Sequence, residues 1–169
     1  MIESAKAWAL KAHGSQKYGQ EPYAVHLYAV VQVLRDFDIK SPHKIAAAWL
    51  HDSIEDTFIT REDIAHGFNH NVADMVWACT GVGINRKARN ASIYEKIKSC
   101  PQAADVKVAD RIANVEASQG TDLAKMYAKE REAFDDAVCG YADQRLRERL
   151  NRAYGATTHE GPVRRRVGV

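Results

Sequence analysis

The run Ala46–Thr57, with the sequence AAAWLHDSIEDT, constrains this chain more than any other stretch. Its apolar start predicts a buried helix that leads directly into His51 and Asp52, and a second acidic pair, Glu55 and Asp56, follows three positions later. Burying an imidazole and several carboxylates is costly unless a cation neutralises them. The run therefore indicates a metal ion, although solvated charges at the end of a helix would give the same pattern.

The spacing of these residues suggests how the ion would be shared. On a helix, residues four apart lie on one face, and both His51/Glu55 and Asp52/Asp56 have this spacing. We therefore expect His51 and Asp52 to bind one ion. Glu55 and Asp56 should lie one turn further along, near the water bound to that ion.

The rest of the chain predicts an all-α fold. Its 169 residues fit one domain, apolar positions recur with helical spacing almost throughout, and no convincing alternating strand pattern occurs. We predict a single helical bundle over residues 1–154 and a disordered tail over residues 155–169. Within the bundle, residues 80–90 are predicted to form a mobile basic loop, and a short helix over residues 92–98 should follow it.

The composition is that of an ordinary globular protein, with 46% hydrophobic and 27% charged residues, and its formal net charge of +2 favours no class of partner. Three scattered cysteines are too few for a disulfide framework. The start of the chain lacks a signal-peptide pattern, and no apolar run is long enough to span a membrane. We expect a cytoplasmic protein without membrane contact. Nucleic acid is favoured only by the arginines at residues 164–166, which is a weak signal.

Two more polar residues are predicted to face the core. His26 lies on the apolar stripe of the helix expected over residues 23–37, and Asp110 lies next to Ala109 in a helix expected over residues 101–118. A single core histidine is more often a hydrogen-bonded packing residue than a metal ligand. Taken alone, each residue leaves both interpretations open.

Taken together, the candidate residues indicate a metal site more specifically than any one of them does. His26, His51, Asp52 and Asp110 come from three predicted helices, which is how helical bundles build metal sites in their cores. Two imidazoles and two carboxylates without a thiolate favour Mn²⁺, Fe²⁺ or Zn²⁺ over Ca²⁺ or Mg²⁺. Such an ion lowers the pKa of bound water and polarises a phosphoryl group.

The segments that carry these residues resemble the hydrolase domain of RelA/SpoT-type alarmone enzymes, which belong to the HD superfamily of metal-dependent phosphohydrolases. The resemblance covers about residues 5–116 and rests on the loop and helix from His13 to His26, the HDSIEDT run at residues 51–57 and the KVADRIAN run at residues 107–114. It implies a small stand-alone hydrolase in which Glu55 and Asp56 orient or deprotonate the attacking water. It also implies that Mn²⁺ is held by His26, His51, Asp52 and Asp110.

The implied reaction is hydrolysis of the 3′-pyrophosphate of (p)ppGpp, giving GDP or GTP and pyrophosphate. The expected substrate-binding residues are Lys17, Tyr18, Lys107, Arg111 and Asn114. Asn114 would contact the ribose or a phosphate. The family usually has arginine where this chain has Lys17, and lysine offers a point charge without a planar face. The Tyr18 ring is then the face on which either purine, guanine or adenine, could stack.

Two other functions stay open. The same chemistry could act on another nucleotide, such as the 2′-phosphate of NADPH or a nucleoside monophosphate, because the ligand set fixes only phosphoester hydrolysis. The chain could also be a non-catalytic HD module that binds nucleotide. The intact Glu55, Asp56 and Asn114 argue against that second alternative. In either case the expected partner is a small nucleotide, and a homo-oligomer is left open.

Overall fold

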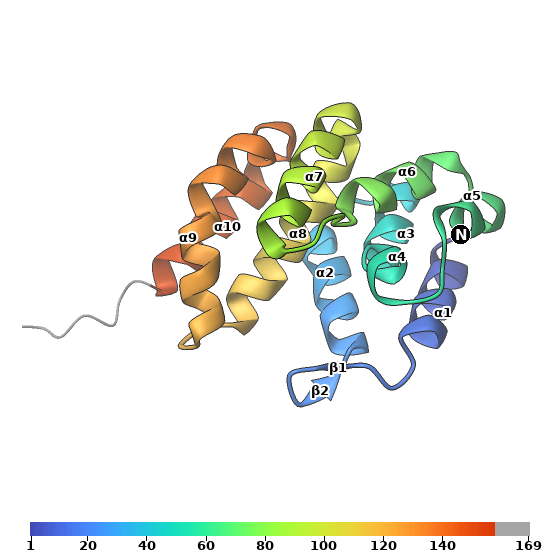
Figure 1. Cartoon of the computed structure of the whole chain (residues 1–169), viewed down its shortest axis with the longest axis horizontal. Helices are drawn as coiled ribbons and strands as arrows, with labels where there is room; N and C mark the ends of the chain where they lie inside the picture. Colours follow the sequence, from blue (N-terminus) through green and yellow to red (C-terminus); the bar gives the residue numbers. More distant parts are fainter. Residues whose placement is uncertain (158–169) are drawn as a thin grey trace, which may run out of the picture.

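A computed structural model describes residues 1–157, and Figure 1 shows that helices make up most of this part of the chain. The all-α prediction is therefore confirmed. The α-helices are α1 (Ile2–His13), α2 (Ala24–Asp36), α3 (Pro42–Leu50), α4 (Ser53–Asp56), α5 (Arg61–Gly67), α6 (His70–Cys79), α7 (Arg86–Ser99), α8 (Ala104–Ala117), α9 (Asp122–Ala137) and α10 (Gln144–Thr157). Short 3₁₀ turns occur at η1 (Pro101–Ala103) and η2 (Cys139–Tyr141).

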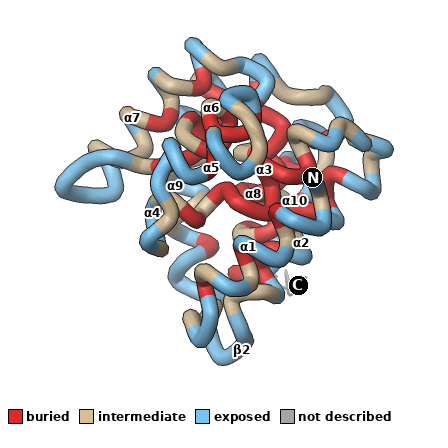
Figure 2. Tube along the Cα trace, turned by 90° about the vertical axis from the view of Figure 1, so that its right-hand side faces the viewer, coloured by how far each residue is buried: buried red, intermediate tan, exposed pale blue. Residues whose placement is uncertain are grey.

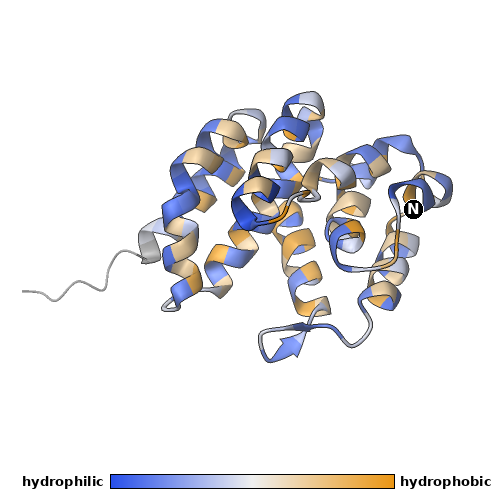
Figure 3. Ribbon diagram, viewed as in Figure 1, coloured by the Kyte–Doolittle hydropathy of each residue, from blue (hydrophilic) through white to orange (hydrophobic). Residues whose placement is uncertain are grey.

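The core of the bundle lies along α3 and α8. Helix α3 contacts α1, α2 and α6, whereas α8 contacts α2 and α10. Three successive alanines of α3, Ala46, Ala47 and Ala48, are completely buried, so neighbouring helices can approach it closely from several sides. Figure 2 shows buried residues concentrated along these two helices, and Figure 3 shows apolar residues along α2 and α3 with hydrophilic residues at the start of α7.

A two-stranded hairpin was not predicted from the sequence. Strands β1 (Lys17–Tyr18) and β2 (Glu21–Pro22) pair antiparallel, with Tyr18 opposite Glu21, and Gly19 in the turn has a φ of 61°. Glycine adopts this positive φ without a steric penalty. Strands of two residues are too short to give an alternating pattern. The hairpin projects from one end of the bundle between α1 and α2 (Figure 1).

The helix that leads into the acidic run ends before His51, although the predicted spacing of the two acidic pairs requires it to continue. Helix α3 ends at Leu50, Asp52 has φ −100° and ψ −1°, and the four-residue helix α4 begins at Ser53. His51 and Asp52 therefore lie in the joint between two helices. Asp56 still lies one helical turn after Asp52, because its amide donates to the Asp52 carbonyl oxygen at 2.9 Å. The expectation of one uninterrupted helix that carries both pairs is wrong.

The predicted mobile loop over residues 80–90 is also wrong in its second half. Helix α7 begins at Arg86, because the side chain of Asn85 caps it by accepting a hydrogen bond from the Ala88 amide at 2.9 Å. The basic residues Arg86, Lys87 and Arg89 are therefore helical, and the predicted short helix is the second half of α7.

At the other end, α10 continues to Thr157, past the predicted boundary at residue 154. The remaining tail, with the arginines at residues 164–166, lies outside the described residues, so its predicted disorder stays a prediction. Among residues 1–157, each helix is too short or too polar to cross a lipid bilayer.

Candidate active site

Three of the predicted metal ligands meet in the core. His26 of α2, His51 at the end of α3 and Asp110 of α8 are 2%, 0% and 6% exposed. His26 Nε2 lies 3.2 Å from His51 Nε2 and 3.2 Å from Asp110 Oδ1, and His51 Nε2 lies 3.6 Å from the same oxygen. One ligand atom from each residue lies within 4.8 Å of the other two, which is close enough for all three to share an ion.

The fourth predicted ligand, Asp52, lies at the edge of this group. Its Oδ2 is 2.9 Å from His51 Nε2 and 3.6 Å from His26 Nε2, and its side chain is partly exposed. The hydroxyl of Tyr23 donates a hydrogen bond to the same oxygen. The structure thus brings together all four predicted ligands, with Asp52 on the more accessible side.

The hydrogen bonding of His51 suits metal binding. Its Nδ1 lies 2.8 Å from the Ala48 carbonyl oxygen, which can only accept a hydrogen bond, so Nδ1 carries the proton. In the neutral ring, the lone pair of Nε2 then points into the cluster. Histidine ligands are commonly held in this way by a hydrogen bond from the other ring nitrogen. With two imidazole nitrogens and two carboxylates, the residues present fit a divalent first-row metal ion.

The electrostatics of the cluster also favour a cation. Burial alone would lower the pKa of His51, yet the Asp52 and Asp110 carboxylates raise this pKa to about 10, and they raise the pKa of His26 as well. Although burial opposes the charged form of the carboxylates, the histidines hold the pKa values of Asp52 and Asp110 well below their usual range, and Lys107 contributes to this at Asp110. The two carboxylates therefore stay charged and attract positive charge into the core.

A cavity of about 220 Å³ opens above the cluster. It brings most of the predicted site residues to one place, namely His26, Asp52, Glu55, Asp56, Lys107, Asp110, Arg111 and Asn114. His51 is fully buried and lies behind the residues that line the cavity. Lys17 and Tyr18 are not among the described residues that line the cavity. Arg86 and Arg89 of α7 do line it, so the first turn of that helix belongs to the site.

Tyr18 packs against the cluster and does not stand free. Its ring stacks on His26 with centroids 4.8 Å apart and planes 18° from parallel, and its hydroxyl donates to Asn114 Oδ1 at 2.8 Å. Asn114 in turn donates to Asp110 Oδ1 at 2.6 Å. One face of the predicted base-stacking ring is thus covered by a histidine. Lys17, the other residue of β1, is exposed.

The acidic pair of α4 is held from two different sides. Glu55 Oε2 accepts a hydrogen bond from the Gly81 amide at 2.7 Å, and Glu55 Oε1 lies 3.8 Å from Arg89 Nε. Asp56 Oδ2 accepts one from Gln16 Nε2 at 2.9 Å. The two carboxylates therefore have separate supports, one after α6 and one after α1, while both line the same cavity.

The sequence did not reveal two residues of α9 that organise the basic side of the cavity. Glu130 accepts hydrogen bonds from Arg86 Nε at 2.6 Å and from Arg111 Nη1 at 2.9 Å. The centroid of the Tyr127 ring lies 4.9 Å from the Arg111 guanidinium carbon. The Tyr127 side chain also lines the cavity. In the sequence Glu130 is one acid among several on a polar helix face, and Tyr127 has the spacing of a core residue, so neither carried a signal.

Together, the helical bundle and its cluster of two histidines and two aspartates under a polar cavity place the chain in the class of helical proteins with a candidate metal site in the core. Within that class the chain matches the HD domain family over residues 5–135. It belongs to this family, and the predicted family assignment is confirmed.

Curated relatives are similar over the same part of the chain. The chain is 35% identical over 120 residues to the guanosine-3′,5′-bis(diphosphate) 3′-pyrophosphohydrolase of Aquifex aeolicus, and this alignment covers 68% of the chain and 17% of that protein. It is 32% identical over 124 residues to the GTP pyrophosphokinase rsh of Brucella ovis, covering 68% of the chain and 16% of the relative. The chain thus spans less than a fifth of the length of these relatives.

A solved structure shares the fold over nearly its whole length. It is that of a metazoan ortholog of SpoT that hydrolyzes ppGpp and plays a role in starvation responses. The two structures superpose with a TM-score of 0.80, over 91% of this chain and 93% of that one, at 22% sequence identity. At this identity the similarity establishes the fold alone.

Proposed function

We propose that this protein is a metal-dependent phosphohydrolase that removes the 3′-pyrophosphate of a guanosine or adenosine alarmone, converting (p)ppGpp to GDP or GTP and pyrophosphate. The observation that carries the proposal is one cavity in which an acidic pair, Glu55 and Asp56, faces basic side chains above the buried histidine and aspartate cluster. The similarity to the Aquifex pyrophosphohydrolase supports the choice of substrate.

The proposed metal site consists of His26, His51, Asp52 and Asp110. A divalent ion bound there would lower the pKa of a bound water and polarise the phosphoryl group. We propose Mn²⁺ as the ion, with Zn²⁺ and Fe²⁺ as alternatives that suit the same nitrogen and oxygen donors.

Glu55 is the proposed general base. Its Oε2 is occupied by the Gly81 amide, so Oε1, on the same carboxylate, is the atom that can take a proton from the attacking water. Asp56, held at Oδ2 by Gln16, has its other oxygen available to orient that water. General bases of this kind contribute roughly 10²–10⁴-fold to a rate.

Basic residues on the opposite wall are proposed to bind the phosphates. Lys107 is 14% exposed and lies beside Asp110. Although burial opposes its charge, Asp110 holds the pKa of Lys107 above its usual value, so the ammonium stays charged. Arg111 and Arg86 face the cavity with guanidinium groups that can bind phosphate oxygens in pairs. The arginines meet charge that accumulates on the leaving pyrophosphate, and Asn114 is proposed to contact the ribose or a phosphate.

The test is a comparison of substrates with Mn²⁺-loaded protein. ppGpp, ppApp, NADPH and a nucleoside monophosphate are incubated separately, and the products are resolved by ion-exchange chromatography. We expect pyrophosphate and a nucleoside diphosphate from ppGpp or ppApp, and no turnover by metal-stripped protein. Release of inorganic phosphate from NADPH without turnover of either alarmone would contradict the proposal. A cytoplasmic location stays a prediction, and a homo-oligomer stays open.

A further inference from the structure

The peptide unit between Thr80 and Gly81 connects the candidate active site to a second part of the molecule. The Gly81 amide donates to Glu55 Oε2 at 2.7 Å, and the Thr80 carbonyl oxygen accepts a hydrogen bond from the Lys96 ammonium of α7. These two backbone groups belong to one rigid planar unit. Any force that orients the carbonyl therefore also orients the amide that holds Glu55.

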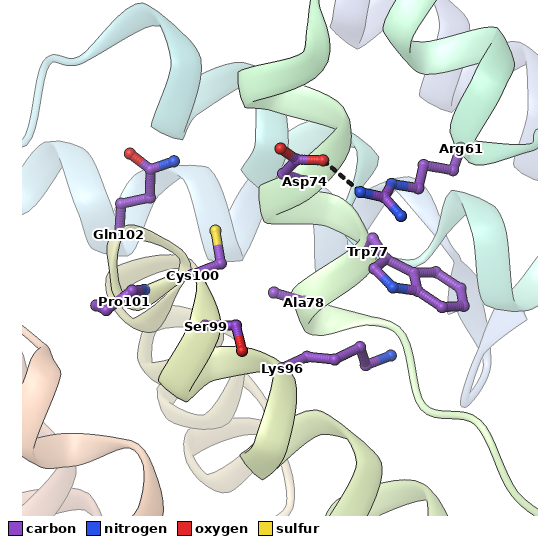
Figure 4. A pocket seen from close by; sticks show the side chains of 9 residues that line it. All are labelled: Arg61, Asp74, Trp77, Ala78, Lys96, Ser99, Cys100, Pro101 and Gln102. Carbon is purple, nitrogen blue, oxygen red and sulfur yellow. Dashed lines mark hydrogen bonds and ion pairs between the residues drawn. The ribbon is translucent and has the colours of Figure 1, made fainter.

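Lys96 itself lies outside the catalytic cavity. It lines a separate cavity of about 450 Å³ between α6, α7 and η1, where its ammonium lies 4.1 Å from the ring centroid of Trp77. Figure 4 shows the side chain extending past Ala78 toward the side on which Trp77 lies. Among the described residues, Lys96 is not one of those that line the catalytic cavity.

Helix α7 fixes this peptide from more than one side. A Cβ atom on Gly81 would come within 2.8 Å of the Arg89 Cβ, so the backbone here packs against α7 more closely than a side chain allows. The next amide, that of Val82, donates to the Ser92 hydroxyl at 2.8 Å. The segment after α6 is thus anchored to three positions of α7, of which Lys96 is the one that contacts the Thr80–Gly81 peptide through its carbonyl.

We propose that Lys96 is a positioning residue that orients Glu55 through the Thr80–Gly81 peptide. The inference rests on the proposed role of Glu55 as general base. A charged donor on the carbonyl polarises the peptide and makes its N–H a stronger donor, because hydrogen bonds in a chain reinforce one another. Held at Oε2 in this way, Glu55 keeps Oε1 directed at the water.

The kinetic test compares Lys96→Met with Lys98→Met. Lys98 lies on the same helix, is exposed and forms an ion pair with Glu95 three residues earlier, so it is a matched control. Assays at pH 7 keep Lys96 charged, because burial lowers its pKa only to about 8. Lys96→Met removes both the contact with Trp77 and the hydrogen bond to the Thr80 carbonyl, but only the hydrogen bond acts on the peptide that holds Glu55. The variant should therefore lower kcat about 10-fold and leave KM within about twofold, while Lys96→Arg should restore most of kcat. Lys98→Met should change neither.

A double-mutant cycle separates positioning from a general loss of stability. In a Glu55→Gln background, Lys96→Met should change kcat by less than about twofold, because the residue it positions no longer acts as a base. A further 10-fold loss in that background would overturn the proposal, and so would an unchanged kcat in the single variant.

An NMR measurement keeps the inference independent of the substrate. The Gly81 amide proton of the wild-type protein should resonate downfield because it donates to a carboxylate, and it should move upfield in Lys96→Met and in Glu55→Gln but not in Lys98→Met. If the wild-type protein fails to hydrolyse either alarmone while this shift pattern is found, the proposed function fails and the positioning of Glu55 by Lys96 stands. If Gly81 does not respond to Lys96→Met, the inference is wrong whatever the substrate.

Discussion

The two walls of the candidate active-site cavity are built in different ways. Three residues of the candidate metal cluster, His26, His51 and Asp110, are almost fully buried in the core, and Asp52 is 19% exposed, whereas the side chains of Arg86 and Arg89 on α7 are 43% and 42% exposed. The cluster is held by the packing of α2, α3 and α8, while Arg86 is held by an ion pair with Glu130 of α9. A phosphate can replace a partly exposed ion pair, but a ligand cannot rearrange a packed core without cost. The cluster should therefore act as an all-or-none unit and the arginine wall as an adjustable one.

Removing a residue of the cluster should have the largest effect. We expect Asp52→Ala to abolish metal binding and to lower turnover by more than about 10³-fold, because the remaining donors leave the ion without its accessible carboxylate. Metal content by mass spectrometry and turnover of ppGpp would be measured on the same preparation. A variant that keeps both would remove Asp52 from the metal site.

Glu55→Gln should separate chemistry from metal binding. This variant should lose roughly 10²-fold in kcat, in line with the loss of a general base, and retain its full metal content. The amide can still accept the Gly81 hydrogen bond, so the loop should keep its place. If Glu55→Gln protein lost the ion instead, Glu55 would be a metal ligand and the distinction between the cluster and its rim would fail.

The buried half of the site could be predicted from the sequence because it follows from helical periodicity. The stripe that carries His26 and the apolar neighbours of Asp110 determine which way these side chains point, and the fold then brings them together. The joint at His51 was missed, since its residues are compatible with a continuous helix. The hairpin at Tyr18 was missed because its strands are too short to form a pattern.

The basic side of the cavity could not be predicted in the same way. Glu130 can pair with Arg86 and Arg111 only because the fold packs α9 against α7 and α8. This pairing depends on the tertiary structure and leaves no periodic pattern in the sequence. Likewise, the Asn85 cap that makes Arg86 helical lies in a run of residues that also suits a loop.

Binding of a metal ion to the cluster should release a proton from His51, so the affinity for the ion should depend on pH. In the metal-free protein the pKa of His51 is about 10, so at pH 7.5 the imidazole is protonated and must lose its proton to bind an ion. Calorimetry in buffers of different ionisation enthalpy should show this release, and the apparent affinity should rise about 10-fold per pH unit for each proton released, up to the pKa. Binding without proton release would contradict the raised pKa of His51.

The smallest predicted effect concerns the arginine wall. Glu130→Gln should lower KM for ppGpp about threefold at low salt, because the phosphates no longer compete with a carboxylate for the partly exposed Arg86. The metal content and kcat should not change. An increase in KM would show that Glu130 mainly orients the arginines, and a loss of metal would show that the two walls are not independent.

The most direct test of the central claim, that the buried cluster is the metal site, is an anomalous-scattering map of crystals of the Mn²⁺-loaded protein. The structure predicts a single strong peak within about 2.0–2.4 Å of His26 Nε2, His51 Nε2 and one carboxylate oxygen each of Asp52 and Asp110. A peak at Glu55 and Asp56 alone, or no peak in fully loaded protein, would contradict it.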